Sequence, residues 1–341
     1  MILGAKEGGR STARGVSLMS KTAILVATSL CVMTALPSII GHQDVTALEG
    51  GIVDGEGTPC VVEDDPFDFA SWQDKGIDGL MFFLHHGRWW QVPGVTYDEL
   101  KPEIDAFQSI KDWGRLTDNF MWIYSTVWQE GGKVPDWFND DDWEAVRANA
   151  RLAARVSKEC GFKGILFDLE SYGGPGVGVW KHPFDYKMYA AEGYKTGGEA
   201  EPRSFAEVCA KVRQRGEEWG EAVTSVHPDI VLLAAGSLYG GALREASQGT
   251  GGMTLPTSDH VGLMPAFFDG LVVGLDERAS LVSAFEGTYL DSTYQDMLIA
   301  RDLGMRQGLV LSKVPELARK RITFTTAIWS DAGIGPLTRT D

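Results

Sequence analysis

The chain has 341 residues, of which 44% are apolar and 23% charged, and it carries a net charge of −16. This composition is typical of a folded protein with one large domain or two small ones. The excess of acid argues against nucleic acid or an anionic membrane as a partner, because both repel a negatively charged protein.

The first 40 residues form a pattern of their own. An apolar run over residues 23–40 follows four basic residues, Lys6, Arg10, Arg14 and Lys21. A basic segment before an apolar run predicts a signal peptide or N-terminal anchor. We therefore expect a secreted or periplasmic protein, in which an irregular lead-in over residues 41–66 precedes a catalytic barrel domain over residues 67–341.

Short apolar runs recur along the rest of the chain and predict six strands. They cover residues 79–84, 120–126, 164–170, 230–236, 281–286 and 321–329. Each run is six to nine residues long and is bounded by polar or glycine-rich sequence, as in buried strands.

Amphipathic segments with start signals lie between these strands. Thr96 with Glu99 and Ser204 with Glu207 have the spacing of a capping box. Asp141 or Asp142 is expected to cap a second helix, and Ser292 with Gln295 a fourth.

Strands that alternate with helices predict a parallel sheet, as either a (β/α)8 TIM-type barrel or an open doubly wound sheet. No glycine-rich nucleotide fingerprint follows the early strands, which favours the barrel. Six clear strands predict that the barrel is irregular or incomplete. Weak apolar runs at 59–63 and 308–312 are the candidates for the missing strands.

The carboxyl ends of parallel strands build the active site of a barrel, so candidate catalytic residues are expected at those ends. The strand at 164–170 has Asp168 and Glu170 on one face, because strand side chains alternate. Glu286 ends another strand with the matching parity. Two carboxyl groups are what glycoside hydrolysis needs, one as acid and one as nucleophile or base.

Aromatic and histidine side chains accompany these acids and indicate a carbohydrate ligand, since sugar rings stack on aromatic faces. The candidates for substrate binding are His85, His86, Trp89, Trp90, Trp128, Tyr172, Tyr239 and Trp329. Core packing is the alternative for each tryptophan, and Trp143 and Trp219, which lie on helix stripes, are assigned to the core. The glycine-rich stretch 237–262 is expected to be a binding loop.

The stretch GFKGILFDLESY, residues 161–172, resembles the fourth-strand signature D-x-x-D-x-D-x-E of chitinase-like glycoside hydrolases. Asp168 and Glu170 match the last two acids, while Lys163 and Leu166 stand at the first two. The resemblance implies that Glu170 is the general acid and that Asp168 supports it. The whole length also resembles barrel-type glycoside hydrolases of exported bacterial proteins. In the large retaining clan of such barrels the acid/base lies on strand four and the nucleophile on strand seven, and this resemblance implies those roles for Glu170 and Glu286.

The sequence thus predicts an exported glycoside hydrolase that needs no cofactor and acts on a poly- or oligosaccharide. One alternative is a metal-assisted hydrolase or lyase on the same barrel, with His85 or His86 beside Asp168 and Glu170. Another is a barrel that binds carbohydrate without turnover. Cys160 and Cys209 are expected to be buried free thiols.

Overall fold

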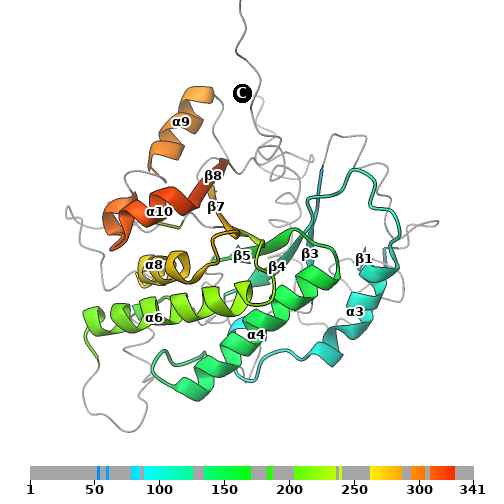
Figure 1. The fold of residues 1–341 in the computed structure, drawn as a ribbon, viewed down its shortest axis with the longest axis horizontal. Coiled ribbons are helices and arrows are strands. Elements are labelled where there is room, and N and C mark those ends of the chain that lie inside the picture. Colours follow the sequence, from blue (N-terminus) through cyan, green and yellow to red (C-terminus); the bar gives the residue numbers. More distant parts are fainter. Residues whose placement is uncertain are drawn as a thin grey trace, which may run out of the picture.

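The computed structural model describes residues 52–53, 59–60, 78–84, 88–125, 134–169, 183–186, 203–235, 238–239, 262–285, 293–303 and 308–326. Its centre is a six-stranded sheet with helices packed against it (Figure 1). The predicted segments 1–40 and most of 41–66 lie outside the described residues.

The sheet consists of strands in the order in which they occur along the chain. They are β3 (Met81–Phe83), β4 (Phe120–Tyr124), β5 (Gly164–Asp168), β6 (Val231–Ala235), β7 (Ser280–Phe285) and β8 (Ile322–Thr326). All neighbouring pairs are parallel. The six predicted strands are confirmed, and their observed bounds differ from the predicted ones by at most three residues.

This strand order distinguishes the two predicted folds. A doubly wound sheet reverses its strand order at a switch point, whereas here every strand lies beside its predecessor. The fold is therefore α/β with the winding of a TIM-type barrel. Among the described residues the edge strands β3 and β8 are not paired with each other, so the described barrel is incomplete.

The prediction that the weak apolar runs 59–63 and 308–312 form further barrel strands was wrong. Residues 59–60 form β2 (Pro59–Cys60), which pairs antiparallel with β1 (Ile52–Val53) in a separate two-stranded sheet. Residues 308–311 form a 3-10 helix, η7 (Gly308–Leu311). Neither run is long enough for its local pattern to specify a strand.

The helices follow the strands in alternation. They are η3 (Arg88–Trp90), α3 (Tyr97–Ser109), α4 (Asp140–Glu159), α6 (Phe205–Thr224), α8 (Met264–Gly274), α9 (Tyr294–Asp302) and α10 (Pro315–Arg321). The capping boxes at Thr96 and Ser204 are confirmed.

Two predicted caps were wrong by a few residues. Asn139 caps α4, and the aspartates predicted as caps, Asp141 and Asp142, lie in the first turn, where the helix dipole favours acids. Thr293 with Asp296 caps α9, one residue after the predicted pair.

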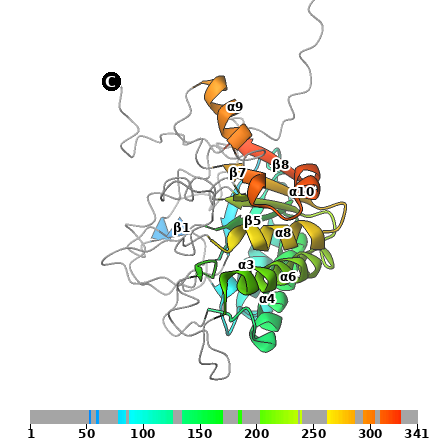
Figure 2. The same cartoon turned by 90° about the vertical axis from the view of Figure 1, so that its left-hand side faces the viewer.

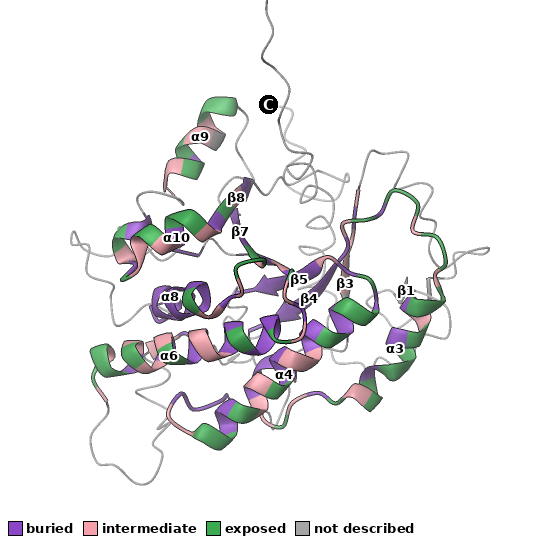
Figure 3. Ribbon diagram, viewed as in Figure 1, coloured by how far each residue is buried: buried purple, intermediate pink, exposed green. Residues whose placement is uncertain are grey.

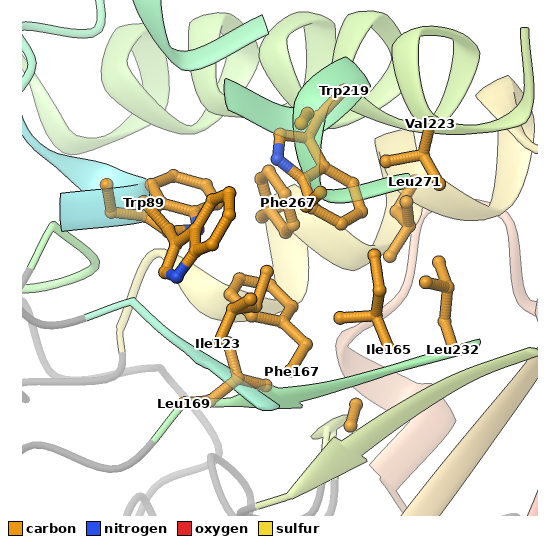
Figure 4. Close-up of a cluster of buried hydrophobic side chains, with 14 of the residues drawn as sticks. Trp89, Ile123, Ile165, Phe167, Leu169, Trp219, Val223, Leu232, Phe267 and Leu271 are labelled. Carbon is orange, nitrogen blue, oxygen red and sulfur yellow. The ribbon is translucent and has the colours of Figure 1, made fainter. Parts of the chain in front are cut away.

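The helices cover one face of the sheet, and the main core lies between the two layers. Figure 2 shows α4, α6 and α8 on the same side of the strands. In Figure 3, α8 is buried along most of its length, whereas buried and exposed residues alternate along α4 and α6. Figure 4 shows the interface, where Phe167 and Ile165 point from the sheet toward Trp219 and Phe267.

Within the helical layer, α6 and α8 approach closely through glycines. A Cβ on Gly216 would lie 2.1 Å from the Phe267 carbonyl oxygen, and one on Gly270 would lie 1.8 Å from the Arg213 carbonyl oxygen. Either methyl group would overlap backbone atoms of the other helix. In the described part of the chain, no helix has both the length and the apolar character to cross a membrane.

Candidate functional site

The inner face of the sheet, opposite the helices, carries a second and smaller cluster of buried side chains. Its members are Phe120, Trp122, Tyr124, Leu166, Leu233, Ala235 and Val282. In a barrel this face points to the interior, and its carboxyl end is where the active site forms.

Asp168 is the last residue of β5 and lies at this end, with 1% of its surface exposed. Its parity places it on the inner face with Leu166. The Trp122 indole Nε1 donates a hydrogen bond to Asp168 Oδ2 at 3.2 Å. Tyr124 is the register partner of Asp168 on β4, and its ring centroid lies 5.0 Å from that of Trp122. We call Trp122, Tyr124 and Asp168 the inner cluster.

One register row continues from the inner cluster across the remaining strands. Ala235 on β6 pairs with Ala284 on β7, which pairs with Thr325 on β8. The row therefore has a large aromatic side chain on β4, a carboxyl group on β5 and small side chains on β6 to β8. A site in this register row would have its aromatic wall on the β4 side.

Thr325 was not predicted as a site residue. The residue is 8% exposed, and its Oγ1 has no hydrogen-bond partner among the described residues. A buried hydroxyl without a partner is uncommon, because leaving it unsatisfied is costly. The alternation in RITFTT, residues 321–326, was the available signal, because it places Thr323 and Thr325 on one face.

Most of the predicted site residues lie outside the described part of the chain. These are Glu170, Glu286, His85, His86, Trp128, Tyr172 and Trp329. The described strands end close to the two acids in sequence, since β5 ends at Asp168 and β7 at Phe285.

The two adjacent tryptophans predicted to bind substrate are core residues. Trp90 is 1% exposed and stacks on Phe167 with ring centroids 5.5 Å apart and an angle of 11° between the planes. Trp89 is 3% exposed and lies on the same helix-facing side (Figure 4). Neither ring offers a face to a sugar, so the core-packing alternative holds for both.

Tyr239, which was predicted to bind substrate, is buried beside α8. It is 1% exposed, and its Oη donates to Asp269 Oδ1 at 2.9 Å. Asp269, on α8, also accepts from Ser312 Oγ at 2.5 Å and from the Lys313 backbone N–H at 2.7 Å. Burial raises the pKa of the Tyr239 hydroxyl. Tyr239 therefore joins a buried structural network and does not face a ligand.

The surroundings of Cys160 and Cys209 disfavour a nucleophilic role near neutral pH. Burial raises the pKa of Cys160 to about 12 and that of Cys209 to about 11. A thiol of so high a pKa stays protonated, and only the thiolate attacks.

No group of three or more metal-ligating side chains occurs among the described residues. The histidines of the predicted metal-assisted alternative lie outside them.

No family model matches this chain, and no curated protein matches it. Solved structures give distant matches. A β-mannanase from the blue mussel Mytilus edulis is 12% identical, with 76% of this chain and 78% of that chain covered and a TM-score of 0.33. A variant of morphinone reductase in complex with tetrahydroNAD is 10% identical, with 66% of each chain covered and a TM-score of 0.28. At TM-scores this low, no residue role or chemistry carries over from either protein.

Proposed function

We propose that this chain is an exported glycoside hydrolase that acts on a poly- or oligosaccharide with two carboxyl groups. The observation that carries the proposal is the buried carboxyl group of Asp168 on the inner face, at the carboxyl end of β5. The interior of a parallel barrel is normally apolar, and a carboxylate is costly to bury there without a purpose. Buried acids in such a position are candidates for function.

The strand order supports the choice of the two reacting acids. Glu170 follows Asp168 by two residues, so a continued strand would keep it on the inner face. Glu286 directly follows β7, and Val282 and Ala284 before it belong to the inner face. The strands β5 and β7 are the two neighbours of β6 and therefore lie about 10 Å apart. Side chains that lean together over that span reach the separation of ~5–9.5 Å used by glycosidase acid pairs.

In this proposal each acid has a separate task. Glu170 donates a proton to the leaving oxygen, and Glu286 acts as nucleophile or base on the opposite side of the sugar ring. Asp168, which accepts the hydrogen bond from Trp122, orients these groups and stabilises the positive charge that develops on the sugar. His85, His86, Trp128, Tyr172 and Trp329 remain our proposed substrate contacts.

The proposal is tested by the turnover of aryl glycosides and soluble polysaccharides by the purified protein. Wild-type protein should release products at the same rate with and without a chelator, whereas the metal-assisted alternative predicts a loss with the chelator. Glu286→Gln should lower turnover by at least ~10²-fold. Glu277→Gln, an exposed glutamate at the other end of β7, is the matched control and should change nothing. Wild-type turnover in Glu286→Gln would contradict the two-carboxylate mechanism.

A further inference from the structure

The hydrogen bond from Trp122 to Asp168 connects two different register pairs of β4 and β5. Trp122 pairs in register with Leu166, and Tyr124 pairs with Asp168. The indole therefore reaches diagonally, one inner-face position further toward the carboxyl end of β5, to donate to Asp168 Oδ2 at 3.2 Å. An indole is long enough for this diagonal contact, which a smaller side chain at position 122 would not make.

The hydrogen bond between Trp122 and Asp168 is buried, which strengthens it. Trp122 is 5% exposed and Asp168 is 1% exposed, so water does not compete strongly for either group. A hydrogen bond to a buried carboxylate is stronger than one at the surface, because the local dielectric constant is low. The second χ angle of an aspartate is soft, and a fixed donor on one oxygen sets the plane of the carboxylate.

We propose that Trp122 is a positioning residue, whose indole N–H fixes the orientation of the Asp168 carboxylate in the active site. The inference rests on the proposed function, in which Asp168 orients the reacting groups. Trp122 acts through Asp168, and it is distinct from the aromatic residues proposed to contact sugar.

The chain offers a matched control for the experiment. Trp143 is also a buried tryptophan, 1% exposed, but its Nε1 has no hydrogen-bond partner within the described ranges, and it packs on the helix side of the sheet. Trp122→Phe and Trp143→Phe both remove an indole N–H and keep an aromatic ring. The first removes a donor from Asp168, and the second removes a donor that bonds to nothing.

The test is a double-mutant cycle on Trp122→Phe and Asp168→Asn, with kcat and KM measured for each folded variant. Trp122→Phe should lower kcat by about 10- to 100-fold, the cost of a misplaced catalytic group, with little change in KM. The double variant should be no slower than Asp168→Asn, because both changes act on one group. Trp143→Phe should keep the wild-type kcat. Independent, additive losses would overturn the inference, as would a wild-type kcat in Trp122→Phe.

A spectroscopic readout keeps the inference testable without activity or a folded Trp122→Phe protein. The indole N–H of Trp122 should give a distinct NMR signal that moves in Asp168→Asn, while the Trp143 signal stays in place. An unmoved Trp122 signal would overturn the inference. Failure of the proposed function is seen separately, as wild-type turnover in Glu170→Gln or Glu286→Gln, whatever Trp122 does.

Discussion

At the scale of single residues, the hydroxyl of Thr325 is buried on the inner face and has no hydrogen-bond partner in the part of the chain that the structure describes. Thr325→Val keeps the shape of the side chain and removes a group whose burial costs about 1–3 kcal/mol when unsatisfied. We therefore expect the variant to unfold at the same denaturant concentration as the wild type or a higher one. If the hydroxyl meets substrate, KM should rise by about tenfold.

Thr224→Val is the matched control for this prediction. The Thr224 hydroxyl is also buried, but it donates to the Gly220 carbonyl oxygen at 2.8 Å. Its replacement should lower the free energy of unfolding by about 1 kcal/mol. An equal loss of stability in both variants would show that Thr325 has a protein partner after all.

His227 makes the stability of the fold depend on pH. Burial lowers the pKa of its imidazole in the folded state, although the nearby Asp229 carboxylate opposes the shift. As the pH falls below about 6.5, the unfolded chain therefore takes up the proton first. The stability contributed by neutral His227 is complete above that pH and declines below it.

We expect His227→Gln to reduce the dependence of stability on pH between about pH 7 and pH 5. Urea unfolding at several pH values checks this, with the wild type as reference. Identical pH slopes in the two proteins would mean that the His227 pKa is the same in the folded and unfolded states.

At the scale of secondary-structure elements, the contact between α6 and α8 depends on Gly216 and Gly270. An alanine in a helix usually stabilises it relative to glycine by up to about 1 kcal/mol. Gly270→Ala should instead destabilise the protein by about 1–3 kcal/mol, because the new methyl group would lie 1.8 Å from the Arg213 carbonyl oxygen. Thermal unfolding measures the sign of the effect, and a stabilised Gly270→Ala variant would contradict this packing.

The sequence predicted the amphipathic helices and missed two of the described α-helices, α8 and α10. The helices α3, α4 and α6 each have one apolar face and a start signal, so periodicity located them. The helix α8 is apolar on nearly all sides, because it is buried between α6 and the sheet, and so it shows no helical period. The helix α10 has seven residues, too few for periodicity to reveal.

The candidate site was predicted only in part for a related reason. Asp168 was identified because a carboxylate inside an apolar strand is unusual in any sequence. The roles of Trp89, Trp90 and Tyr239 were wrong, because sequence position near a strand end does not show on which side of the sheet a side chain packs. Trp122 was missed as a partner of Asp168, since a tryptophan in the middle of a strand is typical of core packing.

At the scale of the whole molecule, the consecutive order of six parallel strands defines a face for helices and a face for a site. In the register row of Asp168, that second face carries the ring of Tyr124 on β4 and only alanines on β6 and β7, so its two sides differ. In our account the substrate lies between these two sides, near Asp168, and is cleaved by acids that follow β5 and β7. The net charge of −16 is consistent with a neutral or polar substrate.

The most direct test of this account is the turnover of Glu170→Gln on two aryl glycosides, one with a good leaving group and one with a poor one. A glutamine has the shape of glutamate but cannot donate the catalytic proton, so we predict a melting temperature near that of the wild type. Turnover should fall by ~10²–10⁴ on the poor leaving group and by less on the good one, which needs less protonation. Full activity on both substrates in a stably folded Glu170→Gln protein would contradict the account.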